Sequence, residues 1–195
     1  MKKSYRVAII GAGLAGLGIA MRLKAAGENS FVILEKSDRA GGTWRDNSYP
    51  GAACDIQSHL YWYSFDTQPD WSHVYCTQPE ILRNIERLVE RTGLKPHLRF
   101  NAEVTEASWD DLTALWLLCT GVGDVITTRY VVTAWGQLNR RATAASRGAR
   151  ASRALPSTRP VGGTMSISQA SASPASATPR APSSSFRRSR RKLRS

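Results

Sequence analysis

Three glycines and one carboxylate near the amino terminus have the spacing of a dinucleotide-binding site. Gly11, Gly13 and Gly16 follow the apolar run 7–10 in G-x-G-x-x-G spacing, and Glu35 ends a second apolar run further on. In such a site the first glycine permits a tight turn, the second lets a pyrophosphate approach the backbone, and the third lets a helix pack closely on a strand. The carboxylate binds the ribose 2′-hydroxyl, so Glu35 favours FAD or NAD over a 2′-phosphorylated nucleotide.

Two strands and one helix are needed to position these residues. The runs 7–10 and 31–34 are apolar and suit buried parallel strands, and a helical pattern begins at the glycines. The phosphates would then lie at the positive end of the helix dipole. A lone G-x-G-x-x-G is a weak signal, because glycine and alanine are common in many helices. Strand, glycines, helix, strand and terminal acid in this order are a strong one.

Charge and cysteine usage limit the other function classes. The 195-residue chain has a net charge of +12, but residues 1–140 carry 15 basic and 15 acidic side chains, whereas residues 141–195 carry 12 basic ones and no acid. A signal for nucleic-acid binding therefore belongs to 141–195 alone. Cys54, Cys76 and Cys119 have neither metal-site nor disulfide-framework spacing and suit reduced thiols in a cytoplasmic protein. The sequence contains no run of about eighteen apolar residues, so no membrane span is predicted.

The segment after Glu35 adds candidate cofactor contacts. The glycine pair 41–42 permits close backbone approach, and Trp44 could stack on a planar ring. The run GGTWRDNSYPGAACDIQSHLYWYSF, residues 41–65, resembles the flavin-dependent monooxygenases of the Baeyer–Villiger type, which are relatives of the flavin-containing and N-hydroxylating monooxygenases.

This resemblance assigns roles to single residues. It implies that Gly42, Thr43 and Trp44 lie along FAD, that Tyr61 is a further flavin-side residue, and that Asp55 is the catalytic candidate. In the family this aspartate lies near the flavin and the nicotinamide and tunes an arginine that comes later in the chain. Taken singly, the aromatic residues could instead be core residues, and the aspartate a turn residue or helix cap. The length of the matching run favours the cofactor roles.

Further along, one helix and three short strands are predicted. Residues 77–80 have the T-x-x-E spacing of a capping box, residues 81–89 are apolar at helical intervals, and Gly93 is expected as the C-terminal cap. Short strands are expected over residues 98–104, 114–118 and 129–133. The resemblance places the backbone of Val104 against the adenine.

The resemblance covers residues 5–140 and implies an α/β fold. The resemblance implies that residues 1–140 form a Rossmann-like FAD-binding domain, with a parallel sheet, helices and a small antiparallel β layer. Intact members also use NADPH and insert one oxygen atom of O2 into a ketone or aldehyde. The chain as it stands is expected to lack that turnover and to bind FAD weakly. Two alternatives stay open: an N-hydroxylating or sulfur-oxidising monooxygenase, and a non-catalytic FAD-binding module with a basic nucleic-acid-binding tail.

Residues 141–195 are rich in Arg, Ser, Ala and Pro, which predicts a disordered basic tail. The same composition arises when a GC-rich gene is translated out of frame. Shifted by one nucleotide, codons compatible with residues 180–186 regroup to A-S-A-I-Q-F. Those for residues 152–168 regroup to a sequence with F-x-G-x-x-x-H-x-x-x-W, the fingerprint of the Baeyer–Villiger type. Raw sequencing reads across codons 139–142 test this frameshift hypothesis.

Overall fold

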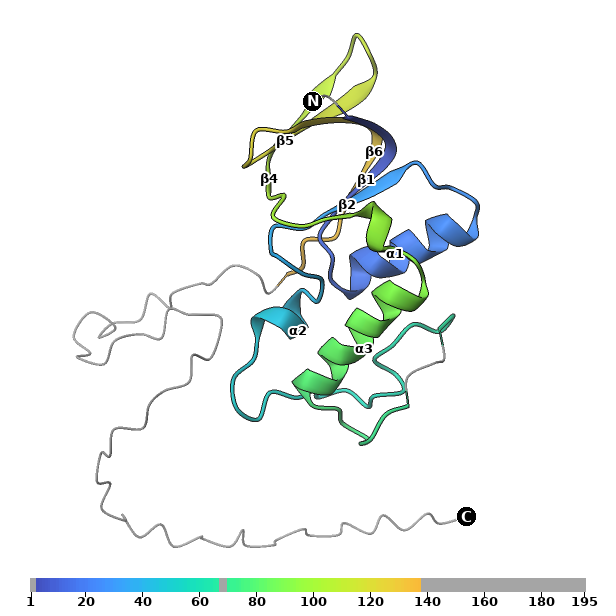
Figure 1. Ribbon diagram of the computed structural model, residues 1–195, viewed down its shortest axis with the longest axis vertical. Helices are drawn as coiled ribbons and strands as arrows, with labels where there is room; N and C mark the ends of the chain where they lie inside the picture. Colours follow the sequence, from blue (N-terminus) through green and yellow to red (C-terminus); the bar gives the residue numbers. More distant parts are fainter. Residues whose placement is uncertain (1–2, 67–69, 138–195) are drawn as a thin grey trace, which may run out of the picture. The chain divides into compact units, whose positions relative to one another are not determined.

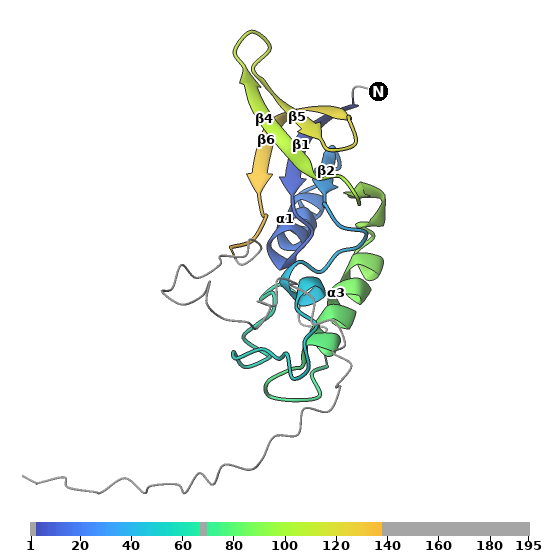
Figure 2. The same cartoon turned by 90° about the vertical axis from the view of Figure 1, so that its left-hand side faces the viewer.

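The computed structural model describes residues 3–66 and 70–137, which form one sheet with helices packed against it (Figures 1 and 2). The predictions for 141–195 lie outside these residues. In chain order the elements are β1 (Lys3–Ile10), α1 (Leu14–Ala25), β2 (Phe31–Leu34), α2 (Thr43–Asp46), α3 (Gln78–Arg91), a 3-10 helix (Lys95–His97), β3 (Leu98–Arg99), β4 (Val104–Asp110), β5 (Leu115–Thr120) and β6 (Val125–Thr133).

The sheet has the order β3-β2-β1-β6-β5-β4. Strands β3, β2, β1 and β6 are parallel, and β4, β5 and β6 are antiparallel neighbours. Ile10 is in register with both Leu34 and Thr133, so β1, β2 and β6 end at the same edge. In open α/β sheets ligands bind outside the carboxyl ends of the strands, and this edge is therefore the place for a site.

Alternation along the parallel strands creates two buried clusters, one on each face of the sheet. Ile9 and Ile33 belong to the larger cluster, which also contains the apolar residues of α3. Ala8 and Leu34, their neighbours in sequence, belong to a smaller cluster with Leu118 of β5. The prediction of two buried parallel strands is confirmed. The Rossmann-like fold class is confirmed as well, with the antiparallel strands continuous with the parallel ones.

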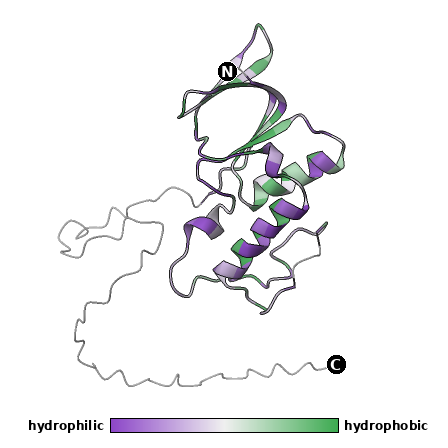
Figure 3. Cartoon of the chain, viewed as in Figure 1, coloured by the Kyte–Doolittle hydropathy of each residue, from purple (hydrophilic) through white to green (hydrophobic). Residues whose placement is uncertain are grey.

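Helix α3 buries one side against the larger cluster. Its buried apolar residues are Ile81, Ile85, Leu88 and Val89, and hydrophilic and hydrophobic residues alternate along the helix in Figure 3. The helix ends at Arg91, and Gly93 follows with a φ of 62°. Because glycine adopts this left-handed conformation readily, the predicted C-terminal glycine cap is confirmed.

The capping box predicted at the start of α3 is wrong in its side-chain contacts. Thr77 is the N-cap residue, but its side chain makes no capping hydrogen bond. Glu80 instead accepts hydrogen bonds from Ser72, at 2.8 Å from the backbone nitrogen and 2.6 Å from the hydroxyl oxygen. The preceding loop therefore supplies two donors to the carboxylate in place of the single N-cap N–H.

Removing the Ser72 hydroxyl is expected to destabilise the protein only above acidic pH. The two hydrogen bonds from Ser72 hold the pKa of Glu80 below its ordinary value. A lowered folded-state pKa gives stability that is present above the unfolded pKa, about 4.3, and is lost as the pH falls through the folded value. For this solvent-accessible contact we expect Ser72→Ala to cost at most about 1 kcal/mol at pH 7. Urea unfolding at pH 7 and pH 3 measures it, and an equal loss at both values contradicts the assignment.

The predicted strand 98–104 is also wrong, because it is broken in the middle. Asn101 has a φ of 54°, which interrupts extended backbone between β3 and β4. The chain there turns so that the Ala102 N–H donates to the carbonyl oxygen of Glu35 at 2.9 Å. Strand β4 then continues to Asp110. Its side chains are mainly exposed, so it has no apolar pattern from which a strand could be predicted. The β4–β5 hairpin projects away from α3 (Figures 1 and 2).

Candidate functional site

The turn between β1 and α1 can be built only with glycine at its first and third motif positions. Gly11 has a φ of 107°, and a Cβ atom there would lie 2.4 Å from the carbonyl oxygen of Ala134, just after β6. A Cβ atom on Gly16 would lie 2.0 Å from the carbonyl oxygen of Gly11. The tight turn and the close helix–strand packing predicted from the spacing are both present.

A second glycine segment packs against this turn. The Gly41 N–H donates to the carbonyl oxygen of Ala12 at 3.0 Å, and a Cβ atom on Gly42 would lie 3.0 Å from the Cα of Gly13. Gly42 also has a φ of 53°. Two backbones therefore approach each other closely beside the start of α1, where bulkier residues would fill the space.

No side chain caps the amino terminus of α1 in the part of the chain that the structure describes. Gly13 is the N-cap residue and supplies no side-chain hydrogen bond, and the first turn contains no acidic residue. The first N–H groups of a helix lack intrahelical acceptors and carry the positive end of the helix dipole. A phosphate group is the kind of ligand that such a terminus binds.

Glu35 is buried directly beside this turn, with only 4% of the residue exposed. Its Oε2 accepts a hydrogen bond from the Ala12 N–H at 2.8 Å, and its Oε1 accepts one from the Ser37 N–H at 3.0 Å. Oε1 also forms an ion pair with Nη1 of Arg45 at 2.9 Å. The structure thus places the predicted ribose-binding carboxylate against the glycine motif.

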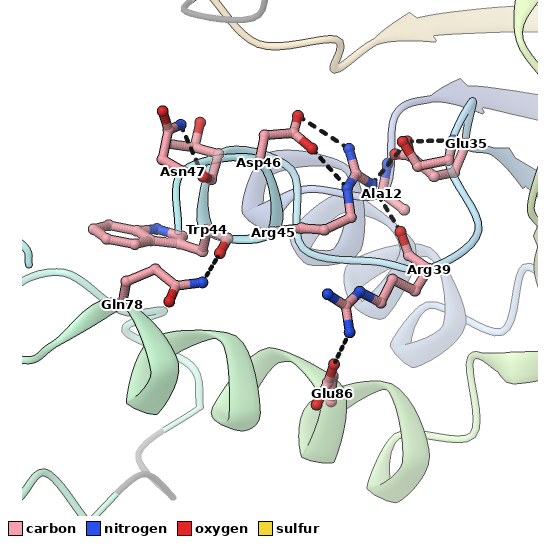
Figure 4. Close-up of polar contacts among 11 residues, drawn as sticks. Ala12, Glu35, Arg39, Trp44, Arg45, Asp46, Asn47, Gln78 and Glu86 are labelled. Carbon is pink, nitrogen blue, oxygen red and sulfur yellow. Dashed lines mark hydrogen bonds and ion pairs between the residues drawn. The ribbon is translucent and has the colours of Figure 1, made fainter. Parts of the chain in front are cut away.

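Arg45 is a site residue that sequence reasoning missed (Figure 4). Its side chain is 6% exposed, and besides Glu35 it contacts both carboxylate oxygens of Asp46 and the carbonyl oxygen of Arg39. Burial opposes its charge, but hydrogen bonding to Asp46 and attraction to Asp46 and Glu35 outweigh burial and raise the pKa of Arg45. Only Asp46, its neighbour in sequence, hinted at an ion pair; nothing in the sequence indicated Glu35.

Trp44, which belongs to the larger core cluster, pairs with Tyr61, which is partly buried and packs against that cluster. The indole N–H of Trp44 donates to the hydroxyl of Tyr61 at 3.2 Å, and the rings meet edge to face. The carbonyl oxygen of Trp44 accepts a hydrogen bond from the side-chain amide of Gln78 on α3. Burial is the main cause that raises the pKa of Tyr61. Thr43 begins α2 immediately before this pair, so α3 and the aromatic pair together fix the segment after the glycines.

The other two predicted residues lie in different places. Asp55 is exposed in the loop before Tyr61 and its charge contributes to the raised pKa of that tyrosine. Val104 begins β4, two residues beyond the Ala102 that binds the backbone of Glu35, and packs on the smaller cluster. Val104 therefore lies near Glu35, whereas Asp55 lies near the aromatic pair. In residues 3–66 and 70–137 there is no cluster of potential metal ligands, and no helix is long and apolar enough to cross a membrane.

Comparison with known proteins identifies related sequences. The NAD(P)-binding Rossmann-like domain family matches residues 9–76. The chain is 46% identical over 134 residues to a Baeyer–Villiger monooxygenase of Streptomyces coelicolor and 43% identical to one of Pseudomonas aeruginosa. These matches cover 69% of this chain and 26% and 25% of the two relatives. A phenazine N-monooxygenase of Lysobacter antibioticus is 34% identical over 143 residues. The chain thus spans about a quarter of the length of these relatives.

Solved structures agree with the sequence matches. An open crystal structure of cyclohexanone monooxygenase is 40% identical, with a TM-score of 0.67 over 70% of this chain and 27% of that one. A complex of OTEMO with FAD and NADP is 30% identical, with a TM-score of 0.68 over 75% of this chain and 28% of that one. FAD and NADP are thus bound together in a solved protein that shares this fold.

Proposed function

Because the chain is homologous to Baeyer–Villiger monooxygenases over about a quarter of their length, we propose that its residues 3–137 bind FAD. One observation carries the proposal: the uncapped start of α1, the buried carboxylate of Glu35 and the paired glycine segments meet where β1 and β2 end. A positive helix end suits a pyrophosphate, and a carboxylate suits ribose hydroxyls. These groups are of the kinds that bind a dinucleotide.

The proposed contacts divide along the cofactor. The turn containing Gly11, Gly13 and Gly16 would hold the pyrophosphate, Glu35 the ribose of the adenosine half, and the backbone of Val104 the adenine. When bound, FAD supplies the redox chemistry, and the protein supplies binding, orientation and electrostatics.

The glycine pair and the segment after it serve the flavin half. Gly42 lets the backbone approach, Thr43 and Trp44 would lie along the cofactor, and Tyr61 and Asp55 would lie on the flavin side. Because Trp44 is buried and Tyr61 packs against the same cluster, these two side chains would support the surface that faces the flavin. Asp55 is exposed.

For the whole protein we propose the reaction of its relatives. In that reaction NADPH and O2 are consumed and one oxygen atom is inserted into a ketone or aldehyde. A second candidate is oxygenation at nitrogen, supported by the similarity to a phenazine N-monooxygenase. The chain alone, which spans about a quarter of the relatives, is not expected to oxidise NADPH when cyclohexanone is added.

Titration of the purified chain with FAD and with FMN tests the binding proposal. FMN lacks the adenosine half, so it cannot use Glu35 or the start of α1 fully. We expect saturable FAD binding, detected by flavin fluorescence, and FMN binding at least about tenfold weaker, which corresponds to about 1.4 kcal/mol. No saturable FAD binding, or equal binding of the two flavins, contradicts the proposal.

A further inference from the structure

We infer that Arg45 is a positioning residue for the cofactor: its buried ion pair holds the Glu35 carboxylate so that Oε2 is presented to the ribose hydroxyls of the adenosine half. The inference rests on the proposed FAD binding, and it assigns a new role to a residue outside the glycine motif. It also implies that discrimination between ribose and 2′-deoxyribose depends on a side chain that does not touch the ligand.

The guanidinium of Arg45 is held from three directions (Figure 4). Nε and Nη2 donate to Asp46 at 2.8 and 3.1 Å, and Nη1 lies 2.7 Å from the carbonyl oxygen of Arg39 and 2.9 Å from Oε1 of Glu35. A guanidinium has five N–H groups, and these contacts use four of them. Arg45 is thus fixed in place, and it is not free to bind a phosphate of the ligand itself.

The contacts of Glu35 leave one of its oxygens less occupied than the other. A carboxylate offers about four lone pairs. Among the residues that the structure describes, Oε1 accepts from Ser37 and Arg45, while Oε2 accepts only from the Ala12 N–H of the glycine turn. Oε2 therefore keeps an acceptor site next to the turn where the pyrophosphate is proposed to lie.

Burial makes Arg45 necessary for this arrangement. A buried carboxylate without a cationic partner is costly and tends to rotate toward solvent or to take up a proton. Either change would remove the oriented acceptor from the ribose. Arg45 thus holds the Glu35 carboxylate in its orientation, and Asp46 in turn keeps Arg45 in place.

Binding of ADP and of 2′-deoxy-ADP to the full 195-residue chain tests the inference, because the ratio of the two dissociation constants reports ribose recognition. The wild-type chain is expected to bind ADP about tenfold more tightly, as the loss of one hydrogen bond to a charged group predicts. Arg45→Gln should bring the ratio close to one, chiefly by weakening ADP. Arg39→Gln is the matched control: it removes a charge from the same segment, the Arg39 side chain is 56% exposed, and Arg45 contacts only the backbone carbonyl of Arg39. It should keep the wild-type ratio.

Each other outcome has a defined meaning. A wild-type ratio in Arg45→Gln overturns the inference, and so does an equal loss of both ligands, which is the result of a merely structural role. If Arg45→Gln does not fold, Arg45→Lys is measured, which keeps one charge but not the planar fork; an intermediate ratio supports the inference and an unchanged ratio overturns it. A wild-type chain that binds neither nucleotide fails at the proposed function itself, which distinguishes the two failures.

Discussion

Replacing Glu35 by glutamine is expected to lower the free energy of unfolding by about 3 kcal/mol, the lower end of the range for breaking a buried ion pair. The variant leaves the positive charge of Arg45 buried, with Asp46 as its one remaining carboxylate partner among the described residues. It also weakens the charge-assisted hydrogen bond from Ala12 that ties the glycine turn to β2. We therefore expect FAD binding to be lost together with the stability. Urea unfolding of the purified variant measures the effect.

Glu28→Gln is the matched control for that experiment. Glu28 pairs with Arg6 at 3.1 Å, where the arginine side chain is 61% and the glutamate side chain 18% exposed, and it also accepts a hydrogen bond from the Ser30 N–H at 2.7 Å, a contact that a glutamine oxygen can keep. Surface ion pairs are worth at most about 1 kcal/mol because water screens both charges. A loss in Glu35→Gln no larger than that in Glu28→Gln would show that the buried network does not stabilise the fold.

Gly16→Ala is expected to destabilise the protein by about 2–3 kcal/mol, although alanine is the better helix former by about 1 kcal/mol. The added Cβ atom would lie 2.0 Å from the carbonyl oxygen of Gly11, a backbone atom that cannot rotate away. Helix α1 must then move off the strand, which displaces its amino terminus from the proposed phosphate position. Thermal unfolding and FAD titration both report the change.

Gly18→Ala is the control that separates the effect of the backbone clash from the effect of helix propensity on stability. Gly18 lies in the same helix, and a Cβ atom there would lie 2.7 Å from the ring of Tyr63. Because a side chain can shift where a backbone carbonyl cannot, we expect a loss well below that of Gly16→Ala. Equal losses in the two variants would contradict the packing role assigned to the third glycine of the motif.

Local features of the site were predictable from the sequence because they depend on a few adjacent residues. The spacing of Gly11, Gly13 and Gly16 after an apolar run predicted a tight turn and a helix packed closely on a strand. The continuous apolar runs 7–10 and 31–34 predicted buried parallel strands, and Gly93 predicted a helix end. The capping box and the strand 98–104 failed because Ser72 and the turn at Asn101 supply contacts or conformations that simple patterns do not contain.

The contacts that bring these features together into one site depend on the tertiary structure. Gly13 meets Gly42, Gly11 meets Ala134, and Glu35 meets Arg45 across separations along the chain that no local pattern encodes. Parallel pairing of β1 with β2 and β6 brings three strand ends to one edge, and the turns that follow must then pack on one another. The glycine spacing and the acid that follows it could be read from a short stretch of residues. The partner of that acid could not, because burial at the sheet edge makes an unpaired carboxylate costly and the fold supplies Arg45 from the next segment.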